Sequence, residues 1–338
     1  MELSDTDRAG LHAALDRMGI GGPPADRVFT PLVGGVSSLI VRVDTAKGRF
    51  CMKQALSQLR VAAVWHAPVA RNAAEVDWIR LVSALEASWV PEVLGHDRVS
   101  QSFAMQYLPH DQYPVWKLHL RDGVVDPSVA EAVGSRLGQI HAATANQAAL
   151  AEQFAHQDQF YALRLEPYFV EAGRRHPTLQ PALQALVERT YGMRRALVHG
   201  DVSPKNILVG PHGPVFLDAE CAVYGDPAFD VAFCLNHLLL KCVWRPAFRS
   251  HYLKSFTQLL DAYTPWVSWE PSADLSARVA ELLAAMLLAR VDGKSPVEYL
   301  TASEDQEQVR RFAVSHVQRP CRSPQDLLDD WSRTVCLP

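Results

Sequence analysis

The sequence lacks any pair of cysteines spaced for a metal site or a redox motif. Its cysteines show no CxxC pair and no metal-ligand spacing, and several stand in apolar context, where buried free thiols are common. This pattern favours a reducing, cytoplasmic setting over a disulfide-stabilised one. The six cysteines are Cys51, Cys221, Cys234, Cys242, Cys321 and Cys336.

Long apolar runs and an excess of one charge are also missing. The most apolar run covers only residues 282–289, whereas a membrane-spanning helix needs about 20 residues. Residues 1–10 are acidic and polar, so we expect no secretory signal there. The net charge of −4 gives no electrostatic reason to expect nucleic acid or an anionic membrane as a partner.

What is present is a chain long enough for two parts with separate cores, since 48% of its 338 residues are hydrophobic. In the first part, a turn at Lys47 and Gly48 joins two predicted strands into a hairpin. Leu108 and Pro109 then break the pattern, so we predict one part over 1–108 and another over 109–338. The elements predicted before the break are a helix over 1–20, strands over 39–43 and 49–53, a helix over 70–85, and strands over 91–97 and 102–107.

The second part is predicted to be mostly helical. Asp126 and Pro127 favour the start of a helix that runs to about Ala143, and Gly293 is a stop signal for another. We expect a hairpin around 197–218 to interrupt the helices. The end of the chain is expected to dock on this part as a final helix. The other predicted helices cover 231–240 and 275–290.

A polar loop between two apolar segments carries the predicted chemistry. Asp201 and Asn206 are five residues apart in the stretch LVHGDVSPKNILV, and Asp218 follows it. Glu220 stands two residues after Asp218, so both side chains share a face if a strand continues through them. Because Mg²⁺ takes oxygen ligands from such side chains, Asn206 and Asp218 are metal candidates and Asp201 remains to accept a proton.

Lys53 and Glu75 complete a pattern that is typical of kinases. In kinases, a lysine from an N-terminal hairpin meets the nucleotide phosphates and a helix glutamate positions it. Lys53 ends the second predicted strand, and Glu75 lies on the next predicted helix. The occurrence of all these residues in this order predicts a kinase more specifically than any one of them does.

These motifs resemble those of the aminoglycoside phosphotransferase-like kinases, a superfamily that includes choline, methylthioribose and homoserine kinases. Gly200 stands where protein kinases usually carry arginine, which favours the small-molecule branch, and the stretch 52–56 (MKQAL) looks most like methylthioribose kinases. The resemblance implies an α+β, two-lobed, protein-kinase-like fold with a small β-rich N-terminal lobe and a larger helical C-terminal lobe. It also implies ATP or GTP as the phosphate donor and Mg²⁺ as the metal.

The resemblance further implies residue roles. Asp201 would be the catalytic base, and Asn206 and Asp218, with Glu220 assisting, would hold the metal. Lys53 would contact the α- and β-phosphates and Glu75 would position Lys53. The remaining implied residues are Gly34, Gly35, Ser37 and Ser38, which would cover the phosphates without a GxGxxG motif, and Gln106, Tyr107 and Leu108, a hinge for the nucleotide base.

Plainer interpretations stand beside these roles. Asp and Asn are common in turns, so an ordinary turn is the plainer interpretation of Asp201 and Asn206. For Lys53 and Glu75 the plainer interpretation is one of many solvated ion pairs at the surface. Glu220 is as compatible with a solvated loop as with a metal. We interpret His199 as structural, and Asp230 as a helix cap that also has the option of fastening the catalytic loop.

The phosphate acceptor is the least determined part. Arg290 and Lys294 follow an apolar helix and are candidates to bind an anionic or polyhydroxylated acceptor, although a helix C-terminus also favours cations. We favour a sugar or hydroxy acid as acceptor. An aminoglycoside-type antibiotic phosphotransferase, a nucleotide-binding pseudokinase and a protein kinase are the alternatives, and the oligomeric state is open.

Overall fold

The computed structural model describes residues 3–32, 38–56 and 71–336. The chain divides into two compact units. The first unit is Met1–Tyr113 with Val215–Glu220, and the second is Pro114–Pro214 with Cys221–Pro338. The return of 215–220 to the first unit differs from the single boundary at 108/109 that we predicted from sequence.

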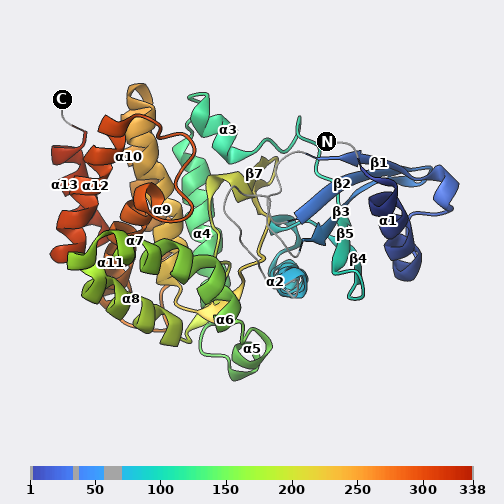
Figure 1. Ribbon diagram of the computed structural model, residues 1–338, viewed down its shortest axis with the longest axis horizontal. Helices are drawn as coiled ribbons and strands as arrows, with labels where there is room; N and C mark the ends of the chain where they lie inside the picture. Colours follow the sequence, from blue (N-terminus) through green and yellow to red (C-terminus); the bar gives the residue numbers. More distant parts are fainter. Residues whose placement is uncertain (1–2, 33–37, 57–70, 337–338) are drawn as a thin grey trace. The chain divides into compact units, whose positions relative to one another are not determined.

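The first unit is built on one antiparallel sheet in the order β1-β2-β3-β5-β4 (Figure 1). The predicted hairpin is its centre, with Thr45 paired to Gly48 at the turn. The edge strand β1 was not predicted. It ends at Pro31, and a proline, which lacks the backbone N–H, is tolerated in a sheet mainly at an edge strand such as this one. The strands are β1 (Val28–Pro31), β2 (Ser38–Thr45), β3 (Gly48–Ala55), β4 (Val93–Asp97) and β5 (Ser102–Gln106).

Helix α1 (Asp5–Met18) closes one core of this unit. Ser4 and Asp7 form a capping box at its start, and Leu11 and Leu15 are buried against the sheet. Met52 of β3 belongs to the same core. Because neighbouring residues of a strand point to opposite faces, Lys53 leaves this core and meets helix α2 (Arg71–Leu85).

The segment Val215–Glu220 joins the first unit through specific contacts. The ring of Phe216 packs edge-on against Trp78 of α2, with ring centres 6.3 Å apart. Two residues later, Asp218 accepts a hydrogen bond from Lys53. A stretch more than a hundred residues away in sequence therefore completes the polar side of the sheet.

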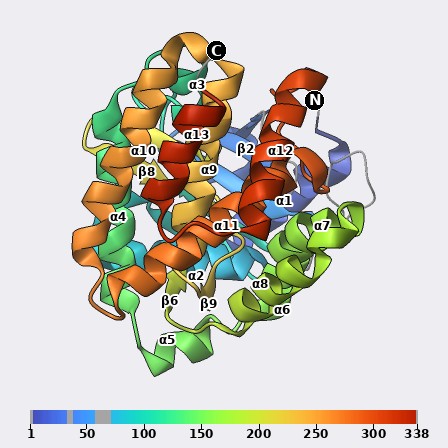
Figure 2. The same ribbon diagram turned by 90° about the vertical axis from the view of Figure 1, so that its left-hand side faces the viewer.

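The second unit is helical, as predicted (Figures 1 and 2). Most side chains of two of its helices, α9 and α11, are buried. Helices α4 and α10 pack so closely that a Cβ on Gly134 would lie 2.1 Å from the carbonyl oxygen of Leu259. The helices are α3 (Trp116–Arg121), α4 (Pro127–Thr144), α5 (Ala148–Gln153), α6 (Gln157–Phe160), the π-helix η3 (Tyr161–Val170), α7 (Glu171–Arg175), α8 (Gln180–Gly192), α9 (Ala228–Trp244), α10 (Arg249–Tyr263), α11 (Ser272–Asp292), α12 (Ser303–Gln318) and α13 (Pro324–Thr334).

Short strands interrupt these helices, in a different arrangement from the predicted hairpin over 197–218. β6 (Ala196–Val198) pairs with β9 (Val223–Gly225), and β7 (Ile207–Gly210) pairs with β8 (Gly213–Phe216). The polar loop with Asp201 therefore connects two different small sheets.

The end of the chain docks on the second unit as two helices, where we predicted one. Both α12 and α13 contact α11, and Figure 2 shows them on its near side. Leu327, Leu328 and Trp331 of α13 are buried and fasten it there. None of the helices in the described part of the chain has the length and apolar character that crossing a membrane requires.

Candidate active site

In the second unit, the loop after β6 buries the side chain of Asp201 and surrounds it with positive charge. Arg164 Nη2 lies 2.9 Å, and Lys205 Nζ 3.2 Å, from the same carboxylate oxygen. Asp201 is 3% exposed and Arg164 is buried beside it, so this pair is little screened by water, whereas Lys205 is half exposed. This is the setting of an ionised carboxylate held in one orientation.

Backbone bonds to Asp230 hold the start of this loop. The buried Asp230 carboxylate accepts hydrogen bonds from the backbone N–H groups of His199 and Gly200, at 2.7 and 2.8 Å. The prediction that Asp230 caps the following helix is wrong, because Asp230 lies inside α9 and the side chain of Asp226 accepts the bond from the first backbone N–H of that helix, Ala228, at 3.0 Å. The alternative function, fastening the loop that holds Asp201, is the one that these hydrogen bonds support.

Gly200 is required by the conformation of the loop. Its φ of +78° is in the left-handed region, and a Cβ there would lie 2.6 Å from the carbonyl oxygen of Cys221. Any larger side chain would therefore be strained by its backbone and blocked by a neighbour.

His199 and Asn206 shape the loop from inside. The Nδ1 atom of His199 accepts a hydrogen bond from the backbone N–H of Asp201 at 3.2 Å, which agrees with a structural role for this histidine. Asn206, in the short turn η5 (Pro204–Asn206), donates from Nδ2 to the backbone oxygen of Asp201 at 3.0 Å. This bond uses the amide nitrogen of Asn206 and leaves its amide oxygen out of the contact.

Arg164 is a site residue that our sequence reasoning missed. It lies on the π-helix η3, and its Nε donates to the backbone oxygen of Gly200 at 2.6 Å. π-helical turns are rare and frequent at functional sites, and no sequence motif announces them. The available signal was a lone arginine between two apolar residues, Leu163 and Leu165.

In the first unit, Lys53 is shared between two carboxylates. Its Nζ donates to the two carboxylate oxygens of Glu75, at 2.9 and 2.7 Å, and also to Asp218. Lys53 and Glu75 are 3% and 2% exposed. The alternative that they form a solvated surface pair is therefore wrong.

Burial and charge oppose each other at this pair. Burial lowers the pKa of Lys53, but the carboxylates of Asp218 and Glu75 outweigh it and the net pKa is raised. Burial raises the pKa of Glu75 to about 7 against the attraction of Lys53. The ammonium is therefore the firmly charged partner.

Glu220 belongs to the same network through a second cation. Arg71, the first residue of α2, donates from Nε to Glu220 at 3.1 Å, so Glu220 is not merely a solvated loop residue. The predicted strand does not continue through Asp218 and Glu220: β8 ends at Phe216, and Asp218 has a φ of +67°. Such a conformation in a residue other than glycine is stored strain of the kind that functional sites show.

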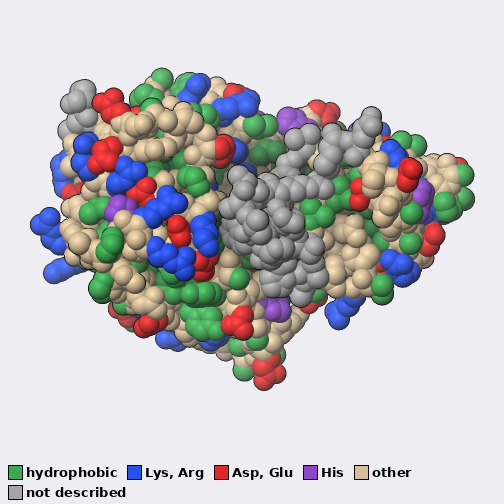
Figure 3. Space-filling view, viewed as in Figure 1, with side chains coloured by type: hydrophobic (Ala, Val, Ile, Leu, Met, Phe, Trp, Pro, Cys, Tyr) green, Lys and Arg blue, Asp and Glu red, His purple; other side chains and the backbone are tan. Residues whose placement is uncertain are grey.

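Carboxylate oxygens are the common feature of this network. Glu75, Asp218 and Glu220 supply oxygen donors of the kind that suits a hard divalent ion. On the face drawn in Figure 3, acidic and basic side chains are interspersed over the helical unit.

The predicted phosphate-covering and hinge residues are described only in part. Gly34, Gly35 and Ser37 lie outside the described residues, whereas Ser38 is the buried first residue of β2. Gln106 ends β5, and its backbone N–H donates to the oxygen of Glu92 at 2.8 Å. Tyr107 and Leu108 follow it, and the ring of Tyr107 has Arg42 and Arg49 within 5.9 Å.

The two predicted acceptor residues do not share partners. Lys294 Nζ lies on the surface, 2.8 Å from both carboxylate oxygens of Glu166. Arg290 is buried instead and donates to the hydroxyl of Tyr168 at 3.0 Å. Only Arg290 is directed into the unit.

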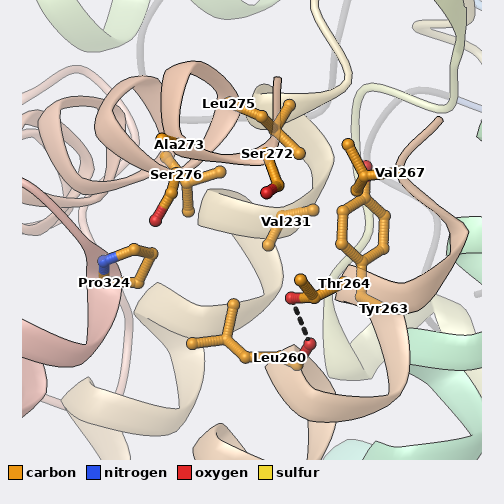
Figure 4. A pocket seen from close by; sticks show the side chains of 11 residues that line it. Val231, Leu260, Tyr263, Thr264, Val267, Ser272, Ala273, Leu275, Ser276 and Pro324 are labelled. Atoms are coloured by element: carbon orange, nitrogen blue, oxygen red, sulfur yellow. Dashed lines mark hydrogen bonds between the residues drawn. The ribbon is translucent and has the colours of Figure 1, made fainter. Parts of the chain in front are cut away.

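A separate pocket of about 230 Å³ opens between α9, α10 and α11 (Figure 4). Val231, Leu260 and Val267 contribute its apolar wall, and beside it the hydroxyl of Thr264 donates to the backbone oxygen of Leu260 at 2.8 Å. Its lining includes no charged side chain, so it does not suit phosphate or a metal.

One further group among the described residues has ligand atoms close enough to hold a metal: His316, Cys321 and Asp330. The ring of His316 already bonds the carboxylate of Asp330 at 3.2 Å and the backbone oxygen of Phe312 at 2.8 Å. These bonds account for the arrangement without an ion.

Comparison with known proteins decides the family. The sequence model of the phosphotransferase enzyme family matches residues 28–266, which is more than half of the chain. The chain belongs to this family. The predicted resemblance and the α+β fold class are therefore confirmed.

Relatives of known activity are similar at low identity. A methylthioribose kinase of Yersinia pseudotuberculosis is 26% identical over 237 residues, covering 61% of this chain and 57% of its own length. One from Escherichia coli is 25% identical over 260 residues, with 67% and 60% covered. The chain thus spans less than two thirds of the length of these relatives.

Solved structures of several kinases have a fold similar to that of this chain. An amicoumacin kinase in complex with AMP-PNP, Ca²⁺ and Ami superimposes with a TM-score of 0.58 at 14% identity, covering 96% of this chain and 97% of that one. The choline kinase LicA from Streptococcus pneumoniae gives 0.53 at 14% identity, with 93% and 99% covered. At these identities the likeness establishes the fold alone.

Proposed function

We propose that this phosphotransferase-family protein is a small-molecule kinase. It transfers the γ-phosphoryl group of ATP to a hydroxyl of a small metabolite, with a sugar or hydroxy acid favoured. The observation that carries the proposal is the sharing of the buried Lys53 between Glu75 and Asp218, which come from three distant segments. Phosphoryl transfer needs a positioned cation beside a metal-binding carboxylate, and a merely structural ion pair would not need the third group.

The nucleotide is assigned to the first unit. Lys53 contacts the α- and β-phosphates and Glu75 orients the ammonium. The backbone of Gln106, Tyr107 and Leu108 binds the base. The chain around Gly34, Gly35, Ser37 and Ser38 covers the phosphates, and the second unit supplies the catalytic loop and the acceptor site.

Mg²⁺ is assigned to Asn206 and Asp218, with Glu220 assisting. The carboxylate oxygens of Asp218 and Glu220, and the Asn206 amide oxygen that the bond to Asp201 does not use, are donors of the kind that a hard divalent ion takes. The bound ion supplies neutralisation of the phosphate charge. Arg71 limits Glu220 to a secondary role, because its guanidinium already occupies part of that carboxylate.

Asp201 is the proton acceptor in this mechanism. The acceptor oxygen forms a bond to the γ-phosphorus, the bond from that phosphorus to the β,γ-bridging oxygen breaks, and the hydroxyl proton passes to an Asp201 carboxylate oxygen. ADP leaves with the electron pair of the broken bond. Arg164 and Lys205 hold the carboxylate in place, and Asp230 holds the loop.

The test is ADP release from ATP and Mg²⁺ in the presence of sugars, hydroxy acids, amino alcohols or aminoglycosides. We expect release that depends on at least one sugar or hydroxy acid and is lost in Asp201→Asn. Binding of ATP without turnover for every acceptor would instead identify a pseudokinase, and turnover confined to aminoglycosides would identify an antibiotic phosphotransferase.

A further inference from the structure

Three basic side chains from neighbouring helices are buried in the second unit beyond the ion pairs of Asp201. His237 and Lys241 are four residues apart on α9, so they share a face of that helix. Arg290 lies near the end of α11, which packs against α9. The three side chains are 7%, 1% and 8% exposed, and we call them the basic cluster.

The ammonium of Lys241 has aromatic rings as its partners. Its Nζ lies 4.4 Å from the ring centre of Tyr299 and 5.3 Å from that of Trp244. Within the described part of the chain it makes no hydrogen bond and no ion pair. The acidic side chain whose field reaches it is Glu298, and that carboxylate is already bonded to Lys117.

Arg290 shows the same shortage of counter-charge. Its Nη1 donates to the hydroxyls of Tyr168 and Ser295, at 3.0 and 3.1 Å, and neither partner is charged. Its Nε is buried with no hydrogen-bond partner among the described residues. A buried donor without a partner is destabilising, so a ligand atom that accepts its hydrogen bond would be favoured here.

The basic groups act on one another. Burial lowers the pKa of Lys241 to about 7, and the charges of Lys117 and Arg290 act in the same direction. Burial likewise lowers the pKa of His237, with Arg290 and Lys241 as the next causes. An anion placed among these groups would be attracted by all of them and would remove the cost of their burial.

A single aromatic ring connects the basic cluster to the catalytic loop. Phe233, one helical turn before His237, has its ring centre 5.6 Å from the His237 ring and 5.8 Å from the guanidinium carbon of Arg164. Arg164 in turn holds Asp201. Phe233 therefore packs between His237 of the basic cluster and the arginine that holds Asp201.

We propose that Lys241 and Arg290 bind an anionic group of the phosphate acceptor, a carboxylate or a phosphate, while the acceptor presents its hydroxyl to Asp201. This inference rests on the proposed kinase function and narrows the acceptor to small hydroxylated anions. The half-buried rings of Trp244 and Tyr299 form the rim through which the anion enters. Lys241 replaces Lys294 as the partner of Arg290, because Lys294 is paired at the surface.

The first experiment compares matched acceptors at equal concentration. ADP release is measured with D-gluconate against D-glucose, with D-ribose 5-phosphate against D-ribose, and with choline as a cation. Calorimetric titration of each compound into the protein reports binding without turnover. We expect at least one anion to bind and to give a kcat/KM at least about tenfold above that of its neutral partner, and the preferred anion distinguishes carboxylate from phosphate.

The second experiment compares Lys241→Met with Lys254→Met, a matched change at an exposed lysine of α10. Loss of one charged hydrogen-bond donor predicts a 10- to 100-fold rise in KM or Kd for the anion in Lys241→Met, with unchanged ATP binding. The thermal midpoint should stay equal or rise, because a buried unpaired charge is removed. Arg290→Met should weaken anion binding in the same way.

The outcomes separate the two proposals. Turnover of neutral or cationic acceptors alone would overturn the anion site and leave the kinase function standing. Anion binding without turnover of any acceptor would support the anion site and overturn the kinase function. Absence of anion binding by the wild-type protein, or anion affinity unchanged by Lys241→Met together with a lowered thermal midpoint, would show that Lys241 only packs on its aromatic neighbours.

Discussion

The Nζ atom of Lys53 donates to both carboxylate oxygens of Glu75, at 2.9 and 2.7 Å, although 22 residues separate the two in sequence. Lys53→Met removes the ammonium that makes both of these hydrogen bonds to Glu75. We expect kcat for ADP release to fall by about 10²–10³, the usual loss for one positioned donor. Steady-state kinetics of ADP release measures it.

Glu75→Gln should be milder than Lys53→Met, because Asp218 still holds the ammonium. We expect about a tenfold loss, and Lys47→Met, at the exposed turn of the same hairpin, should behave as wild type. Equal rates in Lys53→Met and Lys47→Met would refute the assignment of Lys53.

Gly200→Ala tests the conformation of the catalytic loop. A left-handed backbone and a Cβ contact of 2.6 Å with the oxygen of Cys221 predict a loss of about 2–4 kcal/mol in the free energy of unfolding. Gly192→Ala is the control, since its Cβ would meet nothing within 4 Å. Denaturant unfolding followed by circular dichroism measures both, and equal midpoints would contradict the geometry.

Arg164→Met should destabilise the protein, because it removes a partner of the buried Asp201 carboxylate. Breaking a buried pair from one side costs about 3–5 kcal/mol, and Lys205, which is half exposed, offsets only part of that. The double variant with Asp201→Asn should recover stability, because no buried charge is then left unpaired. Additive losses in the double variant would show that the two side chains are not coupled.

The carboxyl group of Asp97 should make the stability of the first unit depend on pH. Burial raises the pKa of its carboxyl, but hydrogen bonds from Arg17, Ser100 and the backbone of Val99 outweigh it and bring the pKa to about 2. Because the pKa of Asp97 is lower in the folded state, its ionised carboxylate stabilises the fold at pH values above the unfolded pKa of about 3.9. This stabilisation is lost as the pH falls toward 2.

The stability difference between wild type and Asp97→Asn should therefore be constant from pH 7 to 5 and shrink between pH 4 and 2. Urea unfolding at each pH measures it, with the exposed Asp26→Asn as control. A difference that stays constant down to pH 2 would mean that the carboxyl is not held as the structure describes.

Local signals in the sequence were enough for the elements that depend on them. The turn at Lys47 and Gly48, the cap at Asp126 and the stop at Gly293 all stand where we predicted, because each depends on neighbours in sequence. The pairing of β6 with β9 was not predictable in this way, since a loop, a hairpin and a turn separate these strands.

The candidate site follows the same division. Lys53, Glu75, Asp201 and Asp218 were identified because a motif orders them along the chain. Arg164 and Lys241 belong to no motif, and their importance arises only from what surrounds them after folding: a buried carboxylate for one and uncharged rings for the other. Such residues are found only by asking, in the folded structure, what surrounds each buried charge.

The central claim is that this chain binds magnesium-loaded ATP through Asp218 and transfers phosphate through Asp201. Calorimetric titration of ATP, with and without Mg²⁺, into wild type, Asp218→Asn and Asp201→Asn tests it most directly. We predict Mg²⁺-dependent binding that Asp218→Asn abolishes and Asp201→Asn retains, with turnover lost in both. Equal nucleotide affinity in all three proteins, or no dependence on Mg²⁺ in the wild type, would contradict the account.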